Sequence, residues 1–286
     1  MSAISAKPSV TIVGAGNLAT ALAPALLEAG YAIDQIISRA SNASLRKARR
    51  LAIKVGASAV SRAGPTIRAE IVWFCVPDSA IASAADSLSS AADWKGKVAL
   101  HSSGALSSDE LAALRRRGAA VASVHPLMTF VAGSQPVLNE VPFAVEGDAR
   151  AGRAARAIVR NLHARAFPIR KQDKALYHAW GMFVSPLLTA LLAASENVAG
   201  AAGVNKNAAR KRMLPILRQT LANYARLGAP QSFSGPIARG DSATVQKHLE
   251  VLRKVSGARS VYVALARQAL HDLPAKNRAA LEKILK

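Results

Sequence analysis

The first 170 residues alternate short runs of β-branched residues with stretches in which Ala and Leu recur at helical spacing. The short runs predict buried strands, and the stretches between them predict amphipathic helices. Strands are predicted at residues 10–13, 32–38, 71–76, 98–101, 120–125, 142–145 and 166–169. Helices are predicted at residues 18–29, 44–55, 79–90, 107–117 and 149–162. Regular alternation of strand and helix is typical of a doubly wound α/β fold with a parallel sheet.

The pattern changes after Gln172. Strand-like runs disappear, and the apolar residues follow helical spacing between breaks that are rich in Gly, Pro and Ser. The change predicts an all-helical second domain. We therefore expect residues 1–170 to form the α/β domain and residues 171–286 to form the helical domain.

The longest apolar stretch covers residues 179–194 and includes Ser185, Pro186 and Thr189. A helix needs about 20 apolar residues to span a bilayer, so we interpret this stretch as a buried helix. Residues 1–9 contain no apolar segment of the kind found in a secretory signal. Together these features predict a cytoplasmic protein.

A glycine motif, Gly14-Ala-Gly16-Asn17-Leu18-Ala19, joins the first predicted strand to the first predicted helix. In a G-x-G-x-x-A motif the first glycine makes the tight turn, and the second lets a pyrophosphate approach the backbone. The alanine allows close packing of helix on sheet, and the helix N-terminus attracts the phosphates. We predict that these residues bind a dinucleotide and that residues 1–170 are a Rossmann domain. A glycine-rich turn without a ligand is the alternative.

The end of the second predicted strand indicates which dinucleotide is bound. NAD sites place Asp or Glu about 20 residues beyond the glycines, whereas this chain has Ser38 and Arg39 there. A guanidinium that pairs with the 2′-phosphate, beside a hydroxyl donor, is typical of an NADP site. We therefore predict NADP(H). The nearby basic residues are interpreted as a solvated helix face; they are Arg46, Lys47, Arg49 and Arg50.

Three other predicted strands end in residues that could contact a ligand, because ligands of such sheets bind beyond the carboxyl ends of the strands. We expect cofactor contacts from Val76, Pro77 and Ser102. We expect substrate contacts from His101, Ser103 and His125, since imidazoles titrate near neutral pH. A structural role for each histidine is the alternative.

A polar stripe crosses the first helix of the second half. Lys174 and His178 are i,i+4 neighbours beside Tyr177, and Ser185 follows at helical spacing. If this stripe faces a cleft, Lys174 or His178 could donate a proton and Ser185 could orient the substrate. These three are the predicted catalytic residues. The alternative is that Lys174 is solvated and His178 only packs.

Charge and cysteine content narrow the choice of function. The chain carries 38 Lys and Arg against 17 Asp and Glu, a net charge of +21. Residues 1–150 hold 15 basic and 11 acidic residues, so most of the excess lies in the second half. Aromatic residues make up 5% of the chain, which gives little support to nucleic-acid binding by base stacking.

The single cysteine, Cys75, excludes a disulfide framework and a cysteine-based zinc site. We predict that Cys75 is buried and that the chain has no metal site.

Several segments together resemble a known family. The chain resembles bacterial Rossmann-like proteins with a C-terminal domain of unknown function, which are distant relatives of pyrroline-5-carboxylate reductase and of deazaflavin-dependent NADP oxidoreductases. The resemblance implies a Rossmann domain, a helical dimerisation domain and an NADP-linked redox role. One departure is Pro186, where the family pattern leads us to expect Asn. The matching segments are Gly14–Ala19, Val76-Pro77-Asp78, His101–Gly104, His125-Pro126-Leu127 with Phe130, Tyr177-His178, Gly235–Asp241 and His248-Leu249.

These observations leave three hypotheses about function. The first is an NADP-dependent oxidoreductase that reduces a small carbonyl or imine substrate with hydride from NADPH, as a homodimer formed through the helical domain. The second is a non-catalytic NADP-binding sensor. The third, suggested by charge alone, is a nucleic-acid-binding protein. The first implies a small-molecule substrate, which the basic surface would attract if it is anionic, and neither a membrane nor a nucleic acid as partner.

Overall fold

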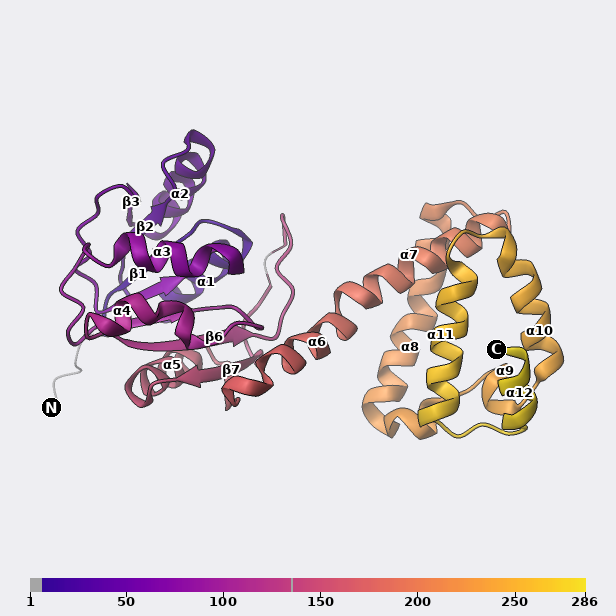
Figure 1. Ribbon diagram of the computed structural model, residues 1–286. Helices are drawn as coiled ribbons and strands as arrows, with labels where there is room; N and C mark the ends of the chain where they lie inside the picture. The colour runs from indigo at the N-terminus through magenta and orange to yellow at the C-terminus, as the bar shows by residue number, and fades with distance from the viewer. Residues whose placement is uncertain (1–6, 135) are drawn as a thin grey trace, which may run out of the picture. The chain divides into compact units, whose positions relative to one another are not determined.

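A computed structural model describes residues 7–134 and 136–286 of the chain (Figure 1). The prediction that residues 1–9 contain no secretory signal concerns a segment of which residues 1–6 lie outside the described residues. The chain forms two compact units, Met1–Met182 and Phe183–Lys286. The division falls inside a helix that begins at Lys174, so the first turns of this helix belong to the unit that contains the sheet.

In the part of the chain that the structure describes, the first unit is built on one eight-stranded sheet with the order β3-β2-β1-β4-β5-β6-β7-β8. All neighbouring strands are parallel except β6 and β7, which are antiparallel. The first six strands have the order found in dinucleotide-binding domains, which confirms the predicted doubly wound fold. The strands are β1 (Val10–Val13), β2 (Ile33–Ser38), β3 (Ser58–Ser61), β4 (Ile71–Phe74), β5 (Val98–His101), β6 (Ala120–Pro126), β7 (Pro142–Gly147) and β8 (Arg165–Pro168).

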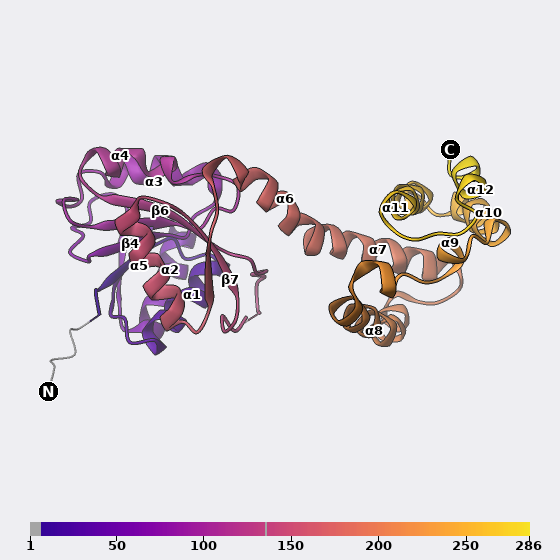
Figure 2. The same ribbon diagram turned by 90° about the horizontal axis from the view of Figure 1, so that it is seen from below.

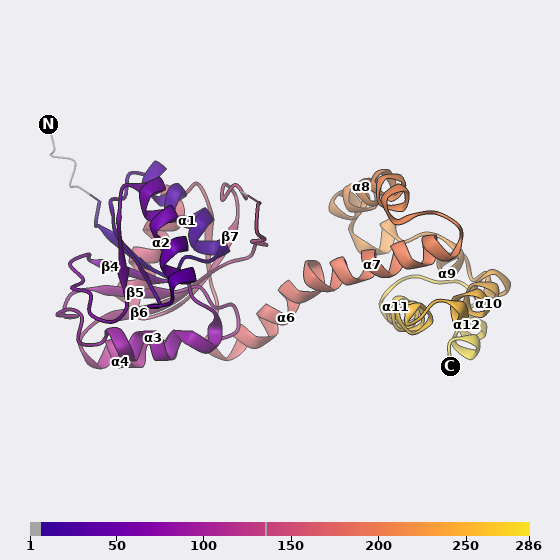
Figure 3. The same ribbon diagram turned by 90° about the horizontal axis from the view of Figure 1, so that it is seen from above.

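Helices cover both faces of this sheet, as Figures 2 and 3 show from opposite sides. The helices are α1 (Asn17–Glu28), α2 (Asn42–Val55), α3 (Ile81–Leu88), α4 (Ala112–Arg116), α5 (Ala149–Asn161) and α6 (Lys174–Val184). Apolar residues of α1, α2 and α5 pack with one face of the sheet, and those of α3 and α4 pack with the other. Burying the strands on both faces explains their nearly unbroken apolar sequences.

Strand β3 was not predicted. It is a short strand of sequence Ser-Ala-Val-Ser at the edge of the sheet, and its side chains are intermediate or exposed. Such a strand lacks the apolar run that identifies buried strands, so only its pairing with β2 reveals it. Cys75 is 8% exposed, which confirms its predicted burial, and burial raises the pKa of its thiol.

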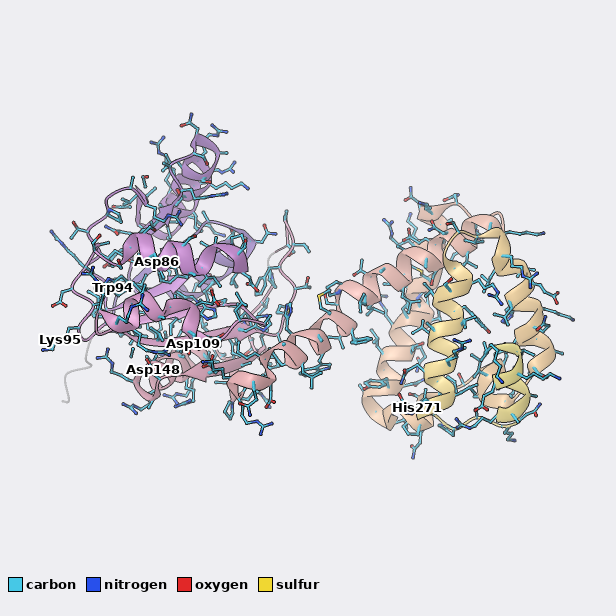
Figure 4. All side chains as sticks on the ribbon, in the orientation of Figure 1. Asp86, Trp94, Lys95, Asp109, Asp148 and His271 are labelled. Atoms are coloured by element: carbon cyan, nitrogen blue, oxygen red, sulfur yellow. The ribbon has the colours of Figure 1, made fainter. Side chains whose placement is uncertain are left out.

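Arg115 ties the segment after β5 to the rest of the sheet. Its guanidinium forms ion pairs with Asp109 at 3.1 Å and with Asp148 at 3.2 Å. The two carboxylates are labelled in Figure 4. Asp148 also accepts from the backbone N–H of Val121 in β6, at 2.8 Å. These contacts anchor the chain that leaves the carboxyl end of β5, where several predicted site residues lie.

The second unit is helical throughout its secondary structure, as predicted. Its helices are α7 (Pro186–Ala201), α8 (Lys206–Ser232), α9 (Pro236–Arg239), α10 (Ser242–Val251), α11 (Ala258–Asp272) and α12 (Arg278–Ile284). Asp241 caps α10 by accepting from the backbone N–H of Thr244 at 3.0 Å. The buried core of this unit is small and consists of Val245, Leu249, Ala266, Leu270, Leu281 and Leu285.

The prediction that residues 179–194 form a buried helix is wrong. Ser185 has φ −131° and ψ −80°, which separates α6 from α7, and no residue of α7 is buried within its own unit. The helical run Lys171–Ala201 is long and apolar enough to cross a membrane, judged by length and composition alone. None of its most apolar 18-residue segment is buried. Apolar residues at helical spacing indicate a helix with an apolar face, but the spacing does not show what covers that face.

Candidate functional site

The glycine turn after β1 is shaped by contacts with two neighbouring strands. Gly14 has φ +109°, and its N–H donates to the carbonyl oxygen of Ile37 at 2.7 Å. A Cβ on Gly14 would lie 2.3 Å from the carbonyl oxygen of Cys75. Gly16 is the N-cap of α1, and a Cβ there would meet no atom within 4 Å. Gly14 thus permits the turn, whereas Gly16 keeps open the space in front of the helix N-terminus.

A cavity of about 370 Å³ opens beside this turn. It lies at the carboxyl ends of β1, β2 and β4, where ligands of doubly wound sheets bind. Six of the residues predicted to bind cofactor line it: Gly14, Gly16, Ser38, Arg39, Val76 and Pro77. The structure therefore brings together these six residues from three separate segments of the sequence.

The other predicted cofactor residues have different surroundings. Ala19 is fully buried in the core beneath α1, and Leu18 packs against the same core. The side-chain amide of Asn17 donates to the carbonyl oxygen of Phe130 at 3.1 Å. The hydroxyl of Ser102 accepts from the indole N–H of Trp73 at 2.8 Å. These residues hold the glycine turn and the strand ends in place, and their contact with a cofactor stays a prediction.

Three cationic side chains line the cavity: Arg39, Lys47 and Arg62. Lys47 is exposed, as expected for a solvated helix face, and it also lines the cavity from α2. Arg62 was missed altogether. Its backbone N–H donates to the carbonyl oxygen of Ser38 at 2.8 Å, directly after the unpredicted strand β3. The pairing of β3 with β2 therefore places a second arginine beside the end of β2.

A second cluster lies at the carboxyl ends of β5 and β6, against the first turns of α6. Lys174 is 1% exposed. Its Nζ donates to the carbonyl oxygen of Ser103 at 3.1 Å and to the hydroxyl of Ser123 at 2.8 Å. Burial lowers the pKa of Lys174 to about 8, although the carboxylates of Glu146 and Asp78 act in the opposite direction. The alternative that Lys174 is solvated is therefore wrong, and its burial favours a positioning role for it.

His101 is fully buried, and both of its ring nitrogens are engaged. Nδ1 accepts from the backbone N–H of Ser103 at 3.1 Å, and Nε2 donates to the carbonyl oxygen of Ser107 at 2.9 Å. Burial lowers the pKa of His101 to about 4. These contacts revise the prediction that His101 binds substrate, because the ring has no nitrogen left to offer. Its role is to shape the turn that follows β5.

The side chain of Ser103 is also committed within the fold. It is 3% exposed, its hydroxyl donates to a carboxylate oxygen of Asp78 at 2.7 Å, and it accepts from the backbone N–H of Leu106 at 2.9 Å. The Ser103 carbonyl accepts from Lys174 and from the hydroxyl of Ser123. Ser103 is thus the centre of a hydrogen-bond network that joins the segments after β4 and β5 to β6 and α6.

His125 and His178 are the more accessible members of this cluster, each of intermediate burial. Their ring centroids lie 6.0 Å apart with an interplanar angle of 85°. A Cβ on Gly104 would lie 2.6 Å from Cδ2 of His178 and 2.9 Å from Nε2 of His125. Both imidazoles therefore pack against the backbone of Gly104, where the Cβ of any other residue would lie too close to them.

We expect Lys174→Met to remove a pH dependence of stability. In the unfolded chain lysine titrates near its ordinary pKa of about 10.4, whereas the pKa of folded Lys174 is lowered to about 8. Between pH 8 and about pH 10.4 the lysine is protonated in the unfolded chain and neutral in the folded protein. Raising the pH through this range should therefore increase the free energy of unfolding of the wild type, by on the order of 1–3 kcal/mol relative to the variant. Urea unfolding at pH 7.5 and 9.5 measures this difference.

Lys95→Met is the matched control for that experiment, because Lys95 is exposed and points away from the fold in Figure 4. It should keep the wild-type profile. If the free energy of unfolding changed with pH in the same way in the wild type and in Lys174→Met, Lys174 would be charged in the folded protein throughout this pH range.

Ser185, the third predicted catalytic residue, belongs to the second unit, at the N-cap position of α7. The helical spacing that grouped it with Lys174 and His178 is broken at Ser185 itself. A shared role for the three residues therefore stays a prediction. Among the described residues, no cluster of three or more His, Cys, Asp or Glu side chains is arranged to hold a metal ion.

Comparisons with known proteins agree with this architecture. Residues 2–126 match the family described as Rossmann-like domain, and residues 141–269 match the domain of unknown function DUF2520. No curated protein sequence matches the chain significantly.

Solved structures resemble the chain over nearly its whole length. BF3122 of Bacteroides fragilis, which carries the provisional name NADP oxidoreductase, is 23% identical with a TM-score of 0.78, over 92% of this chain and 97% of its own. Protein TM1727 of Thermotoga maritima is 24% identical with a TM-score of 0.70, over 97% and 100%. A reductive aminase of Aspergillus terreus, solved with NADPH, is 17% identical with a TM-score of 0.64, over 97% and 99%. At these identities the likeness shows the fold. The chain thus joins a Rossmann-like domain, over residues 2–126, to a C-terminal DUF2520 domain, over residues 141–269.

Proposed function

We propose that this protein is an NADP-dependent oxidoreductase that reduces a small carbonyl or imine substrate. The observation that carries the proposal is the cavity at the glycine turn, in which Arg39, Lys47 and Arg62 gather beside Ser38. The structures that the fold resembles support it, because they include a reductive aminase solved with NADPH and imine reductases.

The residues present fit such a cofactor. The open space at Gly16 gives a pyrophosphate access to the N-terminus of α1. Ser38 and three cations at the other side of the cavity suit the 2′-phosphate that distinguishes NADP from NAD. When bound, NADPH supplies the hydride for the reduction. Val76 and Pro77 line the same cavity after β4.

The chain must also deliver a proton to the reduced substrate. Of the predicted donors, His178 is partly exposed, whereas Lys174 is buried beneath the Ser103 carbonyl. We therefore assign proton donation to His178 and assign to Lys174 the positioning of the turn after β5. His125 lies beside His178 and contacts the substrate in this proposal.

A fluorescence titration with NADPH and NADH tests the cofactor assignment. We expect NADPH to bind at least tenfold more tightly than NADH, a difference of about 1.4 kcal/mol or more. Equal affinities would contradict the assignment. Loss of NADPH absorbance with a panel of carbonyl compounds and amines then tests turnover. Tight NADPH binding without turnover of any compound would favour a sensor over an enzyme.

We further propose that the protein is a homodimer formed through its helical part. Large apolar side chains are exposed along α6 and α7, with Leu176 at 77% and Phe183 at 70%. The small core of the second unit does not cover its own apolar surface, since α8 also exposes Ile216 and Leu221. A self-complementary contact between two copies would bury such patches. Sedimentation velocity should report a dimer, whereas a monomer that binds lipid vesicles would favour a membrane surface instead.

A further inference from the structure

Tyr177 contacts His125 through a hydrogen bond and through edge-to-face packing of the two rings. Its hydroxyl lies 2.8 Å from Nδ1 of His125, and the two rings meet edge to face with centroids 5.5 Å apart. Tyr177 is 7% exposed, and α6 holds it one residue before His178. Its ring also packs edge to face against Phe167 and Trp180. The hydroxyl is therefore held at this nitrogen by packing as well as by its hydrogen bond.

The charges around His125 favour a neutral ring. Burial of the ring is the main reason that the pKa of His125 is lowered to about 4, and the ammonium of Lys174 and the rings of His178 and His101 act in the same direction. The carboxylate of Asp78 in the same network is bonded to the hydroxyl of Ser103. A neutral imidazole carries one N–H, and the partner of Nδ1 decides which nitrogen holds it.

Tyr177 is the better donor of the pair. Burial raises the pKa of its phenol to about 12, so the hydroxyl keeps its proton. An imidazole nitrogen is a far stronger base than a phenol oxygen. The O–H of Tyr177 therefore donates to Nδ1, and the ring proton resides on Nε2. That nitrogen points to the open backbone at Gly104, where a Cβ would lie only 2.9 Å away.

We propose that Tyr177 is a positioning residue, which fixes the neutral His125 tautomer that presents Nε2–H as a hydrogen-bond donor beside Gly104 and His178. This inference rests on the proposed function, which supplies the acceptor: the carbonyl oxygen or a carboxylate of the substrate. Tyr177 then holds the donor in one orientation before the substrate arrives, so His125 orients the substrate while His178 exchanges the proton.

Nuclear magnetic resonance of the full chain labelled with ¹⁵N-histidine tests the inference without any substrate. Long-range ¹H–¹⁵N correlations distinguish the two neutral tautomers, and loss of one spin system in His125→Asn assigns the ring. In the wild type at neutral pH we expect His125 to be protonated on Nε2. In Tyr177→Phe the ratio of the tautomers should shift by roughly fivefold or more toward Nδ1–H, as expected when one hydrogen bond of ordinary net strength is lost.

The chain contains a matched control. In the second unit, Tyr262 contacts Nδ1 of His248 at 3.1 Å in the same edge-to-face arrangement. Tyr262→Phe should alter the signals of His248 and leave those of His125 unchanged. A wild-type His125 protonated on Nδ1, or a ratio that Tyr177→Phe leaves unchanged, would overturn the inference. NADPH titration of the same samples separates the two proposals, because failure to bind NADPH contradicts the proposed function and leaves the tautomer result intact.

Discussion

Replacing Arg39 and Arg62 together with alanine should weaken NADPH binding roughly 100-fold and leave NADH binding almost unchanged. Both side chains line the cavity at the end of β2. A charge-assisted hydrogen bond to a phosphate is worth more than a neutral one, and two such bonds to one group account for a change of roughly this size. Fluorescence titration of each nucleotide measures the two affinities, and the single variants should show intermediate losses for NADPH.

Arg50→Ala is the matched control for this double variant. Arg50 lies on the same helix as Lys47, but it does not line the cavity. Its loss should leave the affinities for both nucleotides close to those of the wild type. If the double variant lost affinity for NADH and NADPH equally, the arginines would act on the shape of the cavity rather than on a 2′-phosphate.

Gly14→Ala should destabilise the first unit by about 3 kcal/mol or more. The backbone at Gly14 has φ +109°, a conformation that L residues rarely adopt, and the new Cβ would lie 2.3 Å from the Cys75 carbonyl oxygen. That oxygen belongs to the backbone just after β4 and cannot move without disturbing the sheet. Urea unfolding followed by circular dichroism measures the loss of stability.

Gly16→Ala separates folding from binding at the same turn. Gly16 has φ −83°, and a Cβ there meets no atom within 4 Å, so stability should change by no more than about 1 kcal/mol. NADPH affinity should nevertheless fall at least tenfold, because the methyl group occupies the approach of the pyrophosphate. Wild-type affinity in Gly16→Ala would contradict this placement of the phosphates, and wild-type stability in Gly14→Ala would contradict the turn geometry.

The glycine turn and its strand could be predicted because their signals are local. Residues 10–19 contain the buried strand, the turn and the helix start in one continuous segment, and the helix begins at Asn17, one residue before the predicted start. Arg62 could not be predicted in the same way. It follows a strand without an apolar run, and only the hydrogen bond from its N–H to Ser38 brings it to the cavity.

The roles of the strand-end residues show a second limit. Sequence placed His101, Ser103 and His125 at the ends of strands, and all three lie there in the cluster around Lys174. Sequence could not distinguish a ring with both nitrogens engaged, such as His101, from one that still has a free nitrogen beside Gly104, such as His125. That distinction depends on contacts with residues far away in the chain.

The doubly wound sheet, the helical second half and the glycine turn follow from local sequence patterns, because periodicity and turn chemistry are properties of neighbouring residues. The tertiary structure alone decided that Lys174 is buried, that Lys47 and Arg62 join Arg39, and that Tyr177 meets His125. Each of these depends on which elements lie side by side. It also decided that the apolar helix after α6 remains uncovered within its unit, since the spacing of apolar residues shows a face but not what packs against it.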